Sequence, residues 1–257
     1  MNETVVFDAV EKSFGDGPEV LHDLSLSVAE GEFVCLLGAS GCGKSTLLSM
    51  IAQLERPTGG ALEVTQGGAA YMFQDPSLFP WLTAEQNIML ALRLAEGRCQ
   101  IRPRRVRRQR AAELLELVRL SEHADRRPHE LSGGMRQRVA LARALAQEKP
   151  VLLMDEPFGA LDAITRSMLH EELLRIWRAT GRTVVFVTHS VDEAVRLGQR
   201  VLLLSSRPGT VLAEWELTAG GQEDPASDHE DLGRAGLVAE ITDHLRKEVG
   251  RHGTHPG

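Results

Sequence analysis

Three groups of residues have the types and spacing needed to bind and cleave a phosphate chain. The first is GASGCGKST at 38–46, which follows the apolar run 33–37 and fits the pattern G-x-x-x-x-G-K-[ST]. In that pattern, glycines let backbone N–H groups surround phosphate oxygens, the lysine reaches the β- and γ-phosphates, and a hydroxyl holds Mg²⁺. The segment therefore predicts a phosphate-binding loop in which Lys44 and Ser45 contact a nucleotide and its metal ion.

The second group stands behind two further apolar runs. Asp155 and Glu156 follow the run 151–154, and His189 follows 184–188. Ligands of open α/β sheets bind at the carboxyl ends of strands, so we expect Asp155 to help bind the metal ion and Glu156 to polarise an attacking water. Helix capping is the alternative for the two acids. The position of His189 alone leaves a structural role and a γ-phosphate contact equally open.

The third group is ELSGGMRQRVALARAL at 130–145, where a serine and two glycines open a predicted amphipathic helix. Helix N-termini leave backbone N–H groups unpaired and carry a partial positive charge, so they suit anions. No lysine follows these glycines, unlike those at 38–46. The chain thus holds one complete phosphate-binding loop and a second, incomplete one.

A regular framework must position these groups, and the hydrophobic pattern predicts one. Several runs are apolar at every residue, which is typical of strands covered on both faces. Strands are predicted at 5–10, 24–28, 33–37, 71–73, 151–154, 184–188, 201–204 and 211–217, and helices at 45–54, 85–94, 105–120, 135–147, 165–179, 191–197 and 232–249. No convincing strand occurs between Trp81 and Ala146. The order predicts an α/β core with an inserted helical subdomain.

Length, charge and cysteine spacing limit the function. The chain has 257 residues, enough for one large α/β domain or two small ones, and a net charge of −7 disfavours a general nucleic-acid binder. No run approaches the roughly 20 apolar residues that span a bilayer, and the first residues lack a signal-peptide pattern, so we expect a cytosolic protein. Cys35, Cys42 and Cys99 lack metal-ligand spacing and are expected to be small buried residues.

Taken together, GASGCGKST, Gln74 in MFQD, LSGGMRQR, VLLMDEP, GALD and His189 resemble, in order and spacing, the ATP-binding subunits of ABC transporters. LSGG is the most specific part, because other P-loop ATPases lack it. The resemblance covers about 3–217 and implies a P-loop NTPase (RecA-like) core with an antiparallel β edge. It also implies an ATP-binding domain at 1–217, with its core at about 1–80 and 147–217 and its helical subdomain at about 81–146. A polar linker and a C-terminal amphipathic helix are expected at 218–257.

The resemblance implies a role for each motif residue in hydrolysis of ATP with Mg²⁺. Phe14 would stack on adenine, although many members of the family have tyrosine there. Gln74 would contact Mg²⁺ and the attacking water, and Asp155 would bond a water that is bound to the metal. Glu156 would be the general base, and His189 would contact the γ-phosphate. The residues implied to hold the phosphates and Mg²⁺ are Gly38, Ala39, Ser40, Gly41, Cys42, Gly43, Lys44, Ser45 and Thr46.

The incomplete loop is explained by the same resemblance. In such subunits Ser132, Gly133 and Gly134 would face a nucleotide held by a second copy, and Asp162 in GALD would lie at the dimer interface. The expected partners are therefore a second copy of the chain, two membrane permease subunits and, indirectly, an extracytoplasmic solute-binding protein, with no nucleic acid. The expected place is the cytoplasmic face of the cell membrane.

The phrases LFPWLTAEQNI and DEPFGALDAITR look most like the importers of nitrate, sulfonates and taurine. Aliphatic sulfonates are the first candidate, with taurine, nitrate and other small anions as alternatives, and the motif set alone leaves export open. Trp81 would lie where the membrane subunit docks, with an ordinary core aromatic as the alternative. Residues 58–71 are short and rich in Gly and Ala, so we expect the edge of the adenine-side sheet to be trimmed.

Six arginines occur among the nine residues 102–110. A patch for nucleic acid or anionic lipid is one interpretation, and the solvated face of a helix is the preferred one. The first interpretation supports an alternative function, a soluble ABC-type ATPase acting on nucleic acid. Histidines without ligand spacing, expected at the surface, are His123, His129, His229, His252 and His255.

Overall fold

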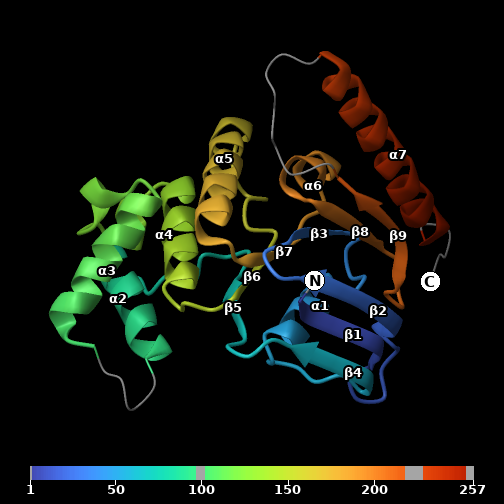
Figure 1. Cartoon of the computed structure of the whole chain (residues 1–257), viewed down its shortest axis with the longest axis horizontal. Coiled ribbons are helices and arrows are strands. Elements are labelled where there is room, and N and C mark those ends of the chain that lie inside the picture. Colours follow the sequence, from blue (N-terminus) through green and yellow to red (C-terminus); the bar gives the residue numbers. More distant parts are fainter. Residues whose placement is uncertain (1, 97–101, 218–227, 253–257) are drawn as a thin grey trace. The chain divides into compact units, whose positions relative to one another are not determined.

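A computed structural model of the chain describes residues 2–96, 102–217 and 228–252 (Figure 1). The chain divides into two compact units. The first unit comprises Met1–Gly68 and Gly181–Gly257, and the second comprises Ala69–Thr180. Among the described residues, no helix is long and apolar enough to cross a membrane.

An antiparallel sheet of three strands begins the first unit. Its central strand β1, Glu3–Lys12, pairs on one side with β2, Leu21–Ala29, and on the other with β4, Gly59–Val64. Val5 and Phe7 of β1 are buried, as the alternation of apolar and polar residues requires for a sheet with one covered face. The three strands lie side by side in Figure 1.

A second group of strands in the first unit is parallel. β3, Phe33–Leu37, lies between β7, Thr183–Val187, and β8, Arg200–Leu204, and all five residues of β3 are buried. β9, Val211–Glu216, adds an antiparallel edge on β8. The continuous apolar runs form these inner strands because neighbours cover both faces.

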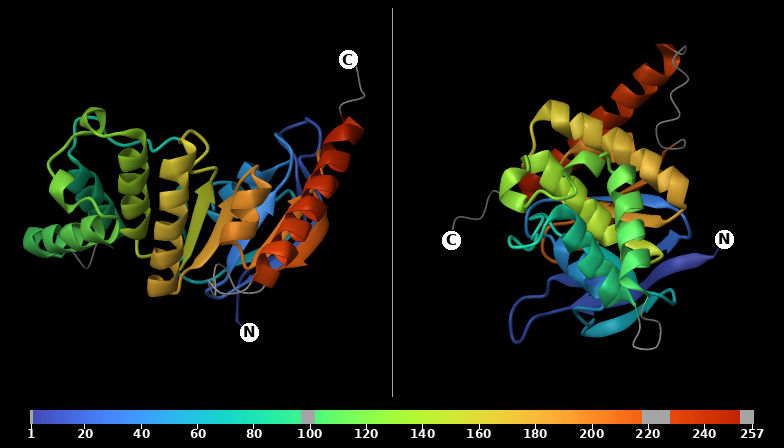
Figure 2. Two further views of the ribbon diagram at one scale, coloured as in Figure 1. Left: turned by 90° about the horizontal axis from the view of Figure 1, so that it is seen from above. Right: turned by 90° about the vertical axis from the view of Figure 1, so that its left-hand side faces the viewer.

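Three helices complete the first unit. α1, Lys44–Ile51, packs against β7, and α6, Val191–Leu197, packs against β3. α7, Asp228–His252, packs on α6 and forms the long red helix in Figures 1 and 2. Ile241 of α7 is fully buried.

The second unit combines two parallel strands with a helical group. β5, Ala69–Met72, pairs with β6, Val151–Asp155. The helices α2, α3 and α4 pack on one another, and α4 also contacts β5 and α5. The helices of this unit are α2 (Ala84–Ala95), α3 (Arg104–Leu117), α4 (Gly133–Leu145) and α5 (Ala163–Thr180), with short 3-10 turns at Ser121–His123 and Pro128–Glu130.

Each predicted strand and helix has a counterpart, and within 81–96 and 102–146 the structure contains no strand, as predicted. One strand was missed. This strand is β4, Gly59–Val64, whose backbone pairs with β1 despite its two glycines, and the expected trimming of the sheet edge stays a prediction. The predicted linker begins with residues outside the described part of the chain, as does Cys99, and the limits of the helical subdomain stay predictions.

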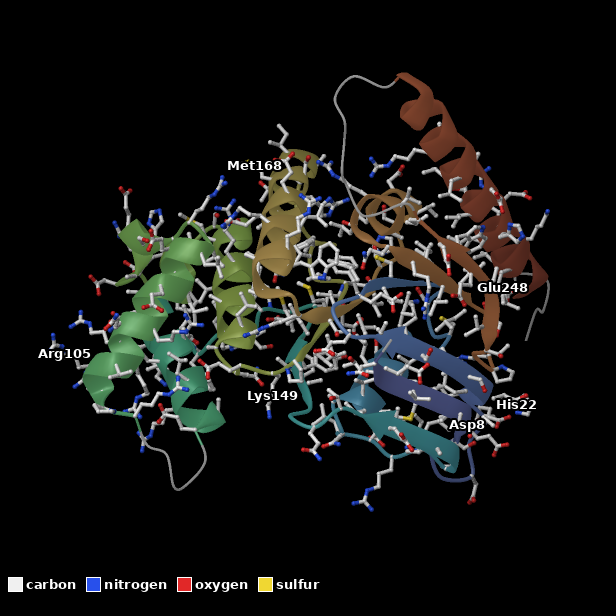
Figure 3. The ribbon with its side chains drawn as sticks, viewed as in Figure 1. Asp8, His22, Arg105, Lys149, Met168 and Glu248 are labelled. Atoms are coloured by element: carbon white, nitrogen blue, oxygen red, sulfur yellow. The ribbon has the colours of Figure 1, made fainter. Side chains whose placement is uncertain are left out.

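The arginine run lies at and just before the start of α3, and several of its guanidinium groups pair with acids of the second unit. Arg107 and Glu96 form a largely buried ion pair at 3.0 Å. Two exposed pairs are Arg102–Glu148 and Arg110–Glu113, and the exposed Arg108 pairs with the half-buried Glu85. Arg105 is exposed, at the periphery of α3 (Figure 3). The run therefore consists of a helix surface whose charge is partly neutralised by neighbouring acids.

Candidate nucleotide-binding site

The predicted phosphate loop, residues 38–43, joins β3 to α1 in the first unit. Lys44, the first residue of α1, is buried, and its ammonium donates to the carbonyl oxygens of Gly38 at 2.8 Å and Ala39 at 2.9 Å. The same nitrogen lies 3.6 Å from the sulfur of Cys42. The loop thus surrounds the Lys44 ammonium, which is expected to contact the phosphates. Ser45 is exposed at the start of α1.

The remaining loop residues differ in exposure. Ser40 and Gly41 are exposed, Ala39 and Thr46 are half-buried, and Cys42 is fully buried. Gly41 and Gly43 have φ angles of +79° and +97°, in the left-handed region that glycine tolerates. The backbone can therefore curl tightly enough to point several N–H groups toward one anion.

His189 follows β7 at the same end of the sheet as the phosphate loop. β7 and β3 run parallel, with Leu36 opposite Val187, so the loop after each strand begins at the same edge. His189 is exposed there. The next residue, Ser190, caps α6 by accepting from the N–H of Glu193, and its own N–H donates to the Thr188 hydroxyl. The histidine is therefore held in a short, hydrogen-bonded turn.

In the second unit, the carboxyl ends of β5 and β6 bring two predicted site residues to one edge. Gln74 comes two residues after β5, and Asp155 is the last residue of β6. The hydroxyl of Tyr71 on β5 donates to Oδ2 of Asp155 at 3.1 Å. Tyr71 thus fixes the orientation of the carboxylate, a role that no sequence pattern indicated because the two residues are 84 positions apart.

Glu156 directly follows β6 and has an unusual backbone conformation. Its φ is +44°, which a residue other than glycine adopts only at a cost in free energy of about 1 kcal/mol or more. Its carbonyl accepts from the N–H of Gly159, which closes a turn. Backbone strain of this kind is common at functional sites, and here it holds the side chain of Glu156 directly beyond Asp155.

The incomplete loop forms the N-terminus of α4. Ser132 is the N-cap, and its hydroxyl oxygen accepts from the N–H of Met135 at 3.3 Å. Gly134 is buried, and a side chain there has no room because its Cβ would meet Thr165 of α5 at 2.6 Å. Gly133 is half-buried and has more room, with Leu161 at 3.4 Å from the position of a Cβ. Ser132 and Gly133 are therefore the more accessible positions of this segment.

Asp162 stands before α5. Its carboxylate accepts from the N–H of Thr165 at 3.0 Å, and this hydrogen bond lowers the pKa of the exposed Asp162 carboxyl. The aspartate therefore has a local role as the cap of α5. That role leaves its place at a dimer interface a prediction.

Two further residues of α4 hold the segment after Gln74. The side-chain amide of Gln137 donates to the carbonyl oxygen of Gln74 at 3.1 Å. The guanidinium of Arg143 donates to the carbonyl oxygens of Pro76 and Ser77 at 2.6 and 2.7 Å, and burial lowers its pKa. The helix that begins at the incomplete loop is thus bonded to the backbone beside Gln74.

Phe14 lies after β1 and is 48% exposed. The ammonium of Lys12 is 4.6 Å from the centroid of its ring, within the range of a cation–π contact. Lys12 is itself held by Glu55 at 2.9 Å. The aromatic side chain expected to stack on adenine is therefore at the surface of the first unit.

Trp81 is 67% exposed, so its interpretation as a core aromatic is wrong. Its ring lies 5.5 Å from that of Phe79, centroid to centroid. The fully buried Asn87 of α2 fixes this segment, since its amide donates to the carbonyls of Phe79, Leu82 and Thr83 and accepts from the N–H of Phe79. A buried amide thus fixes the backbone that carries these two exposed rings.

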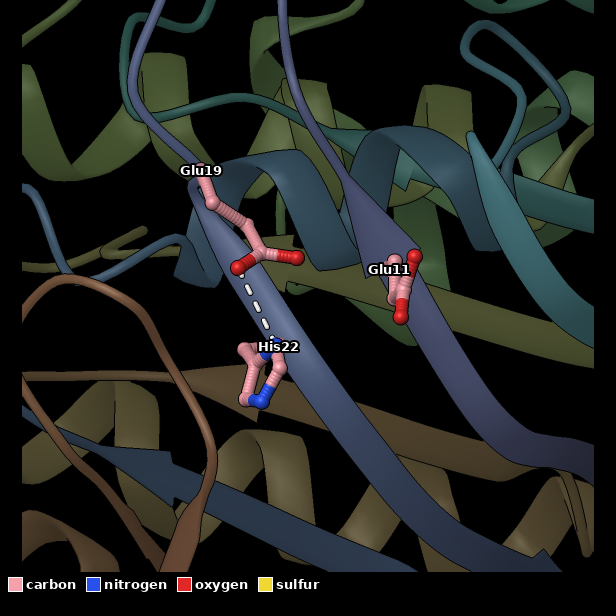
Figure 4. Close-up of side chains that lie close together, drawn as sticks. All are labelled: Glu11, Glu19 and His22. Atoms are coloured by element: carbon pink, nitrogen blue, oxygen red, sulfur yellow. Dashed lines mark ion pairs between the residues drawn. The ribbon is translucent and has the colours of Figure 1, made fainter.

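A separate cluster of metal-ligating residue types lies on the first unit. One ligand atom from each of Glu11, Glu19 and His22 lies within 4.8 Å of the others (Figure 4). His22 and Glu19 form an ion pair at 3.0 Å. Glu11 and His22 are exposed, and exposed acids commonly gather without a metal, so we assign this cluster no site.

The cysteines and histidines that the structure describes agree with the sequence analysis in part. Cys35 and Cys42 are buried, as predicted, and both are free thiols. His129 is exposed, as predicted, and His123 is half-buried. The side chains of the other three histidines expected at the surface, His229, His252 and His255, lie outside the described residues.

Comparison with known proteins identifies the family. The ABC transporter family model matches residues 21–159. The aliphatic sulfonates import ATP-binding protein of Bacillus subtilis is 46% identical over 217 residues, which cover 80% of this chain and 82% of that protein. The taurine import ATP-binding protein of Burkholderia pseudomallei is 48% identical, over 77% of this chain and 76% of that protein. The nitrate import ATP-binding protein of Synechococcus elongatus is 45% identical, over 81% and 78%.

Solved structures agree on the fold. A dimeric ATP-binding cassette in a post-hydrolysis state, bound to ADP and Pi, is similar with a TM-score of 0.73 and 34% identity, and the match covers 84% of this chain and 99% of that one. The predicted fold class, a P-loop α/β fold with an antiparallel β part and helical parts, is thereby confirmed. The chain belongs to the ABC transporter family, as an ATP-binding subunit and ATPase of the group whose members include importers of nitrate, sulfonates and taurine.

Proposed function

We propose that the chain is the ATP-hydrolysing subunit of an importer for a small anion, with aliphatic sulfonates as the first candidate and taurine or nitrate as alternatives. The observation that carries this proposal is the 45–48% identity, over most of the chain, to relatives named for these three anions. Because the identities are so similar, they favour the class of substrate more strongly than any one member. Selection of the substrate belongs to other subunits of such an importer.

In this proposal the phosphate loop and Lys44 bind the phosphates of ATP. The buried ammonium and the left-handed glycines of the loop support this role, since both suit a multiply charged anion. Phe14 contacts the adenine, and His189 contacts the γ-phosphate. Glu156 accepts a proton from the attacking water.

Mg²⁺ is the metal that the family implies. The oxygen donors offered by Ser45, Gln74 and Asp155 fit it, because Mg²⁺ prefers hydroxyl, amide and carboxylate oxygens together with water. When bound, the ion neutralises charge on the phosphates. Tyr71 keeps the carboxylate of Asp155 oriented for this task through its hydrogen bond.

We further propose that two copies of the chain share each nucleotide. Ser132 and Gly133, at the N-terminus of α4, would present N–H groups and a partial positive charge to the γ-phosphate held by the other copy, with Gly134 and Asp162 beside them. The dimeric state of the related cassette bound to ADP and Pi supports this arrangement. Lys44 of the other copy already neutralises the phosphates, which explains why no lysine follows Gly133 and Gly134.

The exposed rings of Phe79 and Trp81 support docking of a membrane permease on the second unit. Exposed aromatic side chains are enriched at protein interfaces, and Asn87 fixes the backbone on both sides of Trp81. Two permease subunits would place the chain at the cytoplasmic face of the membrane. A solute-binding protein outside the membrane would deliver the anion.

Hydrolysis is tested with Glu156→Gln, which keeps the size of the side chain and removes the general base. We expect ATP binding to persist and turnover to fall by at least about a hundredfold, because general base catalysis contributes that much. The variant should also accumulate as a dimer with ATP on a sizing column. Normal turnover would remove Glu156 from this role.

The substrate is tested with the chain assembled with its permease subunits in vesicles. Uptake of labelled methanesulfonate, taurine and nitrate is compared, each with the matching solute-binding protein, and Lys44→Ala serves as the inactive control. ATP-dependent uptake of methanesulfonate supports the first candidate. Uptake of taurine alone or nitrate alone would favour that alternative and contradict the first candidate, and uptake of none of the three would contradict the whole proposal.

An ATPase that acts on nucleic acid remains the alternative function. The net charge of −7 and the pairing of Arg102, Arg107, Arg108 and Arg110 with acids argue against it. Stimulation of the ATPase by RNA or DNA, but not by permease-containing vesicles, would favour this alternative.

A further inference from the structure

The loop between β8 and β9, residues 205–210, lies directly against the phosphate loop of the first unit. Gly209 has no room for a side chain, because a Cβ there would meet the carbonyl oxygen of Cys42 at 2.2 Å. The Nε of Arg207 lies 3.4 Å from the carbonyl oxygen of Gly41. A second guanidinium nitrogen lies 3.1 Å from the position that a Cβ of Gly41 would occupy. Both contacts fall on the turn that is expected to wrap the phosphates.

The 205–210 loop is itself fixed at several points. The N–H of Gly209 donates to the carbonyl of Val20 at 2.8 Å, and its carbonyl accepts from the N–H of His22. The hydroxyl of Ser205 donates to the carbonyl of Pro208 and accepts from the N–H of Thr210. These hydrogen bonds hold the loop in the conformation in which Arg207 contacts Gly41.

The C-terminal helix supplies one more anchor. Glu248, in the last turns of α7, is 4% exposed, and its carboxylate accepts from the N–H of Ser206 at 2.8 Å (Figure 3). Ser206 immediately precedes Arg207. A buried carboxylate that bonds a backbone N–H is a strong anchor, since its charge shortens and strengthens the bond.

We infer that Glu248 and Arg207 are positioning residues that connect α7 to the phosphate loop. Glu248 fixes the backbone before Arg207, and Arg207 then fixes the peptide between Gly41 and Cys42 through its carbonyl. In a trans peptide the N–H points opposite to the carbonyl, so holding the oxygen of Gly41 also fixes the N–H of Cys42, which donates to the carbonyl of Ala39 at 3.3 Å and closes the turn of the loop. Preorganised N–H groups bind phosphate more tightly than N–H groups that must first be ordered. The inference rests on the proposed role of the loop in binding ATP.

The test compares ATP affinity and turnover of the full chain in Arg207→Ala and Glu248→Ala. Each variant should weaken ATP binding about three- to tenfold, the range expected when one ordinary hydrogen bond is lost. The KM for ATP should rise by the same factor, while kcat at saturating ATP stays within about twofold. Because Glu248 acts through Arg207, the two losses of affinity should not add. The double variant should bind ATP only slightly more weakly than the single variant with the lower affinity.

Two matched variants separate this path from general packing of α7. Glu248→Gln keeps an oxygen that can accept from Ser206, so its loss of affinity should be less than half that of Glu248→Ala. Glu240→Ala removes the bond from Trp215 to the same helix and leaves residues 205–210 untouched, so ATP affinity should be unchanged. Equal losses in Glu240→Ala and Glu248→Ala, or additive losses in the double variant, would overturn the inference.

Cys42 reports on the loop without any turnover. Its thiol is fully buried under the loop, so a looser loop should react faster with a maleimide, and ATP should slow the reaction. Cys35 is the internal reference, because burial raises the pKa of its thiol and keeps it unreactive. Mass spectrometry of the labelled peptides should show faster labelling of Cys42 in Arg207→Ala and Glu248→Ala. Unchanged labelling of Cys42 would contradict the inference.

Lys44→Ala distinguishes failure of the inference from failure of the proposed function. Normal ATP binding by Lys44→Ala would show that the loop at 38–43 does not bind the phosphates, and both proposals would fall. Loss of binding in Lys44→Ala, with normal affinity in Arg207→Ala and Glu248→Ala, would overturn the inference alone.

Discussion

The hydroxyl of Tyr71 orients one carboxylate of the candidate site. It donates to Oδ2 of Asp155 at 3.1 Å and so orients the carboxylate that is proposed to act at the metal. Ring stacking on Phe73, with centroids 4.2 Å apart, holds the tyrosine in place. The sequence contains both residues, but nothing in the spacing of β5 and β6 shows that one side chain reaches the other.

Tyr71→Phe removes the hydroxyl and keeps the ring. We expect the apparent affinity for Mg²⁺ in the ATPase reaction to fall about tenfold, because partners of this kind orient metal-binding groups. Binding of ATP measured with EDTA present should not change. The measurement is ATPase rate against Mg²⁺ concentration at saturating ATP, and an identical Mg²⁺ dependence in both proteins would contradict the role.

At the scale of elements, α4 and α5 are joined by a buried charge. Glu172 of α5 is 3% exposed, and its carboxylate lies 3.1 Å from the guanidinium of Arg138 on α4. Arg119 and Arg175 lie 3.8 and 3.6 Å from the same carboxylate. Since α4 begins at Ser132 and Gly133, this cluster holds in place the helix that would face the other copy of the chain.

Glu172→Ala leaves Arg138 without its buried partner. We expect the free energy of unfolding to fall by about 3 kcal/mol, the cost typical of breaking a buried ion pair. Glu171→Ala, at an exposed neighbouring position, should cost less than about 1 kcal/mol. Urea denaturation of both variants measures the difference, and equal losses would show that the cluster adds no stability.

The sequence predicted those elements whose own pattern is strong and missed what depends on distant partners. β3 and β6 are apolar at nearly every residue, so their burial was evident. Gly59–Val64 has weak strand propensity and becomes β4 because β1 offers it a backbone to pair with. Motif residues could be proposed for the site because their chemistry requires a fixed spacing. The sequence could not predict side-chain contacts whose partners lie far away along the chain or are backbone carbonyls, because such contacts leave no pattern. The residues concerned are Tyr71, Asn87, Arg143 and Arg207.

For the whole molecule, the proposed dimer is best tested at Gly133. A change at Gly134 would push against Thr165, and a change at Ser132 would remove the cap of α4, so both would disturb the fold itself. Gly133→Asp suits the start of a helix, and its charge would repel a γ-phosphate held by the other copy.

We expect Gly133→Asp to bind ATP as the wild type does and to lose ATPase activity by at least about tenfold, since like charges at an interface cost several kcal/mol. Gly133→Asn has the same size without the charge and should retain more activity. Sedimentation with ATP should show a monomer for the aspartate variant. Equal loss of ATP binding and hydrolysis would place Gly133 beside the nucleotide of its own chain.

Assembly with the permease is tested at Trp81. Trp81→Ala should leave ATP binding unchanged and weaken co-purification with the permease subunits at least about tenfold, as loss of a central aromatic anchor does. Leu94→Ala is the control, because Leu94 is an equally exposed apolar residue of the second unit. Normal assembly of Trp81→Ala would exclude this aromatic pair from the interface.

The bonds of Lys44 to Gly38 and Ala39 have a consequence for nucleotide selection. An arriving nucleotide must exchange its own oxygens for two carbonyls that already satisfy the ammonium. ATP and ADP carry a β-phosphate that can make this exchange, whereas AMP has none to offer and leaves the lysine on its internal ligands. The carbonyl oxygens of Gly38 and Ala39 thus compete with the nucleotide for Lys44, and we expect AMP and adenosine to bind much more weakly than ATP and ADP.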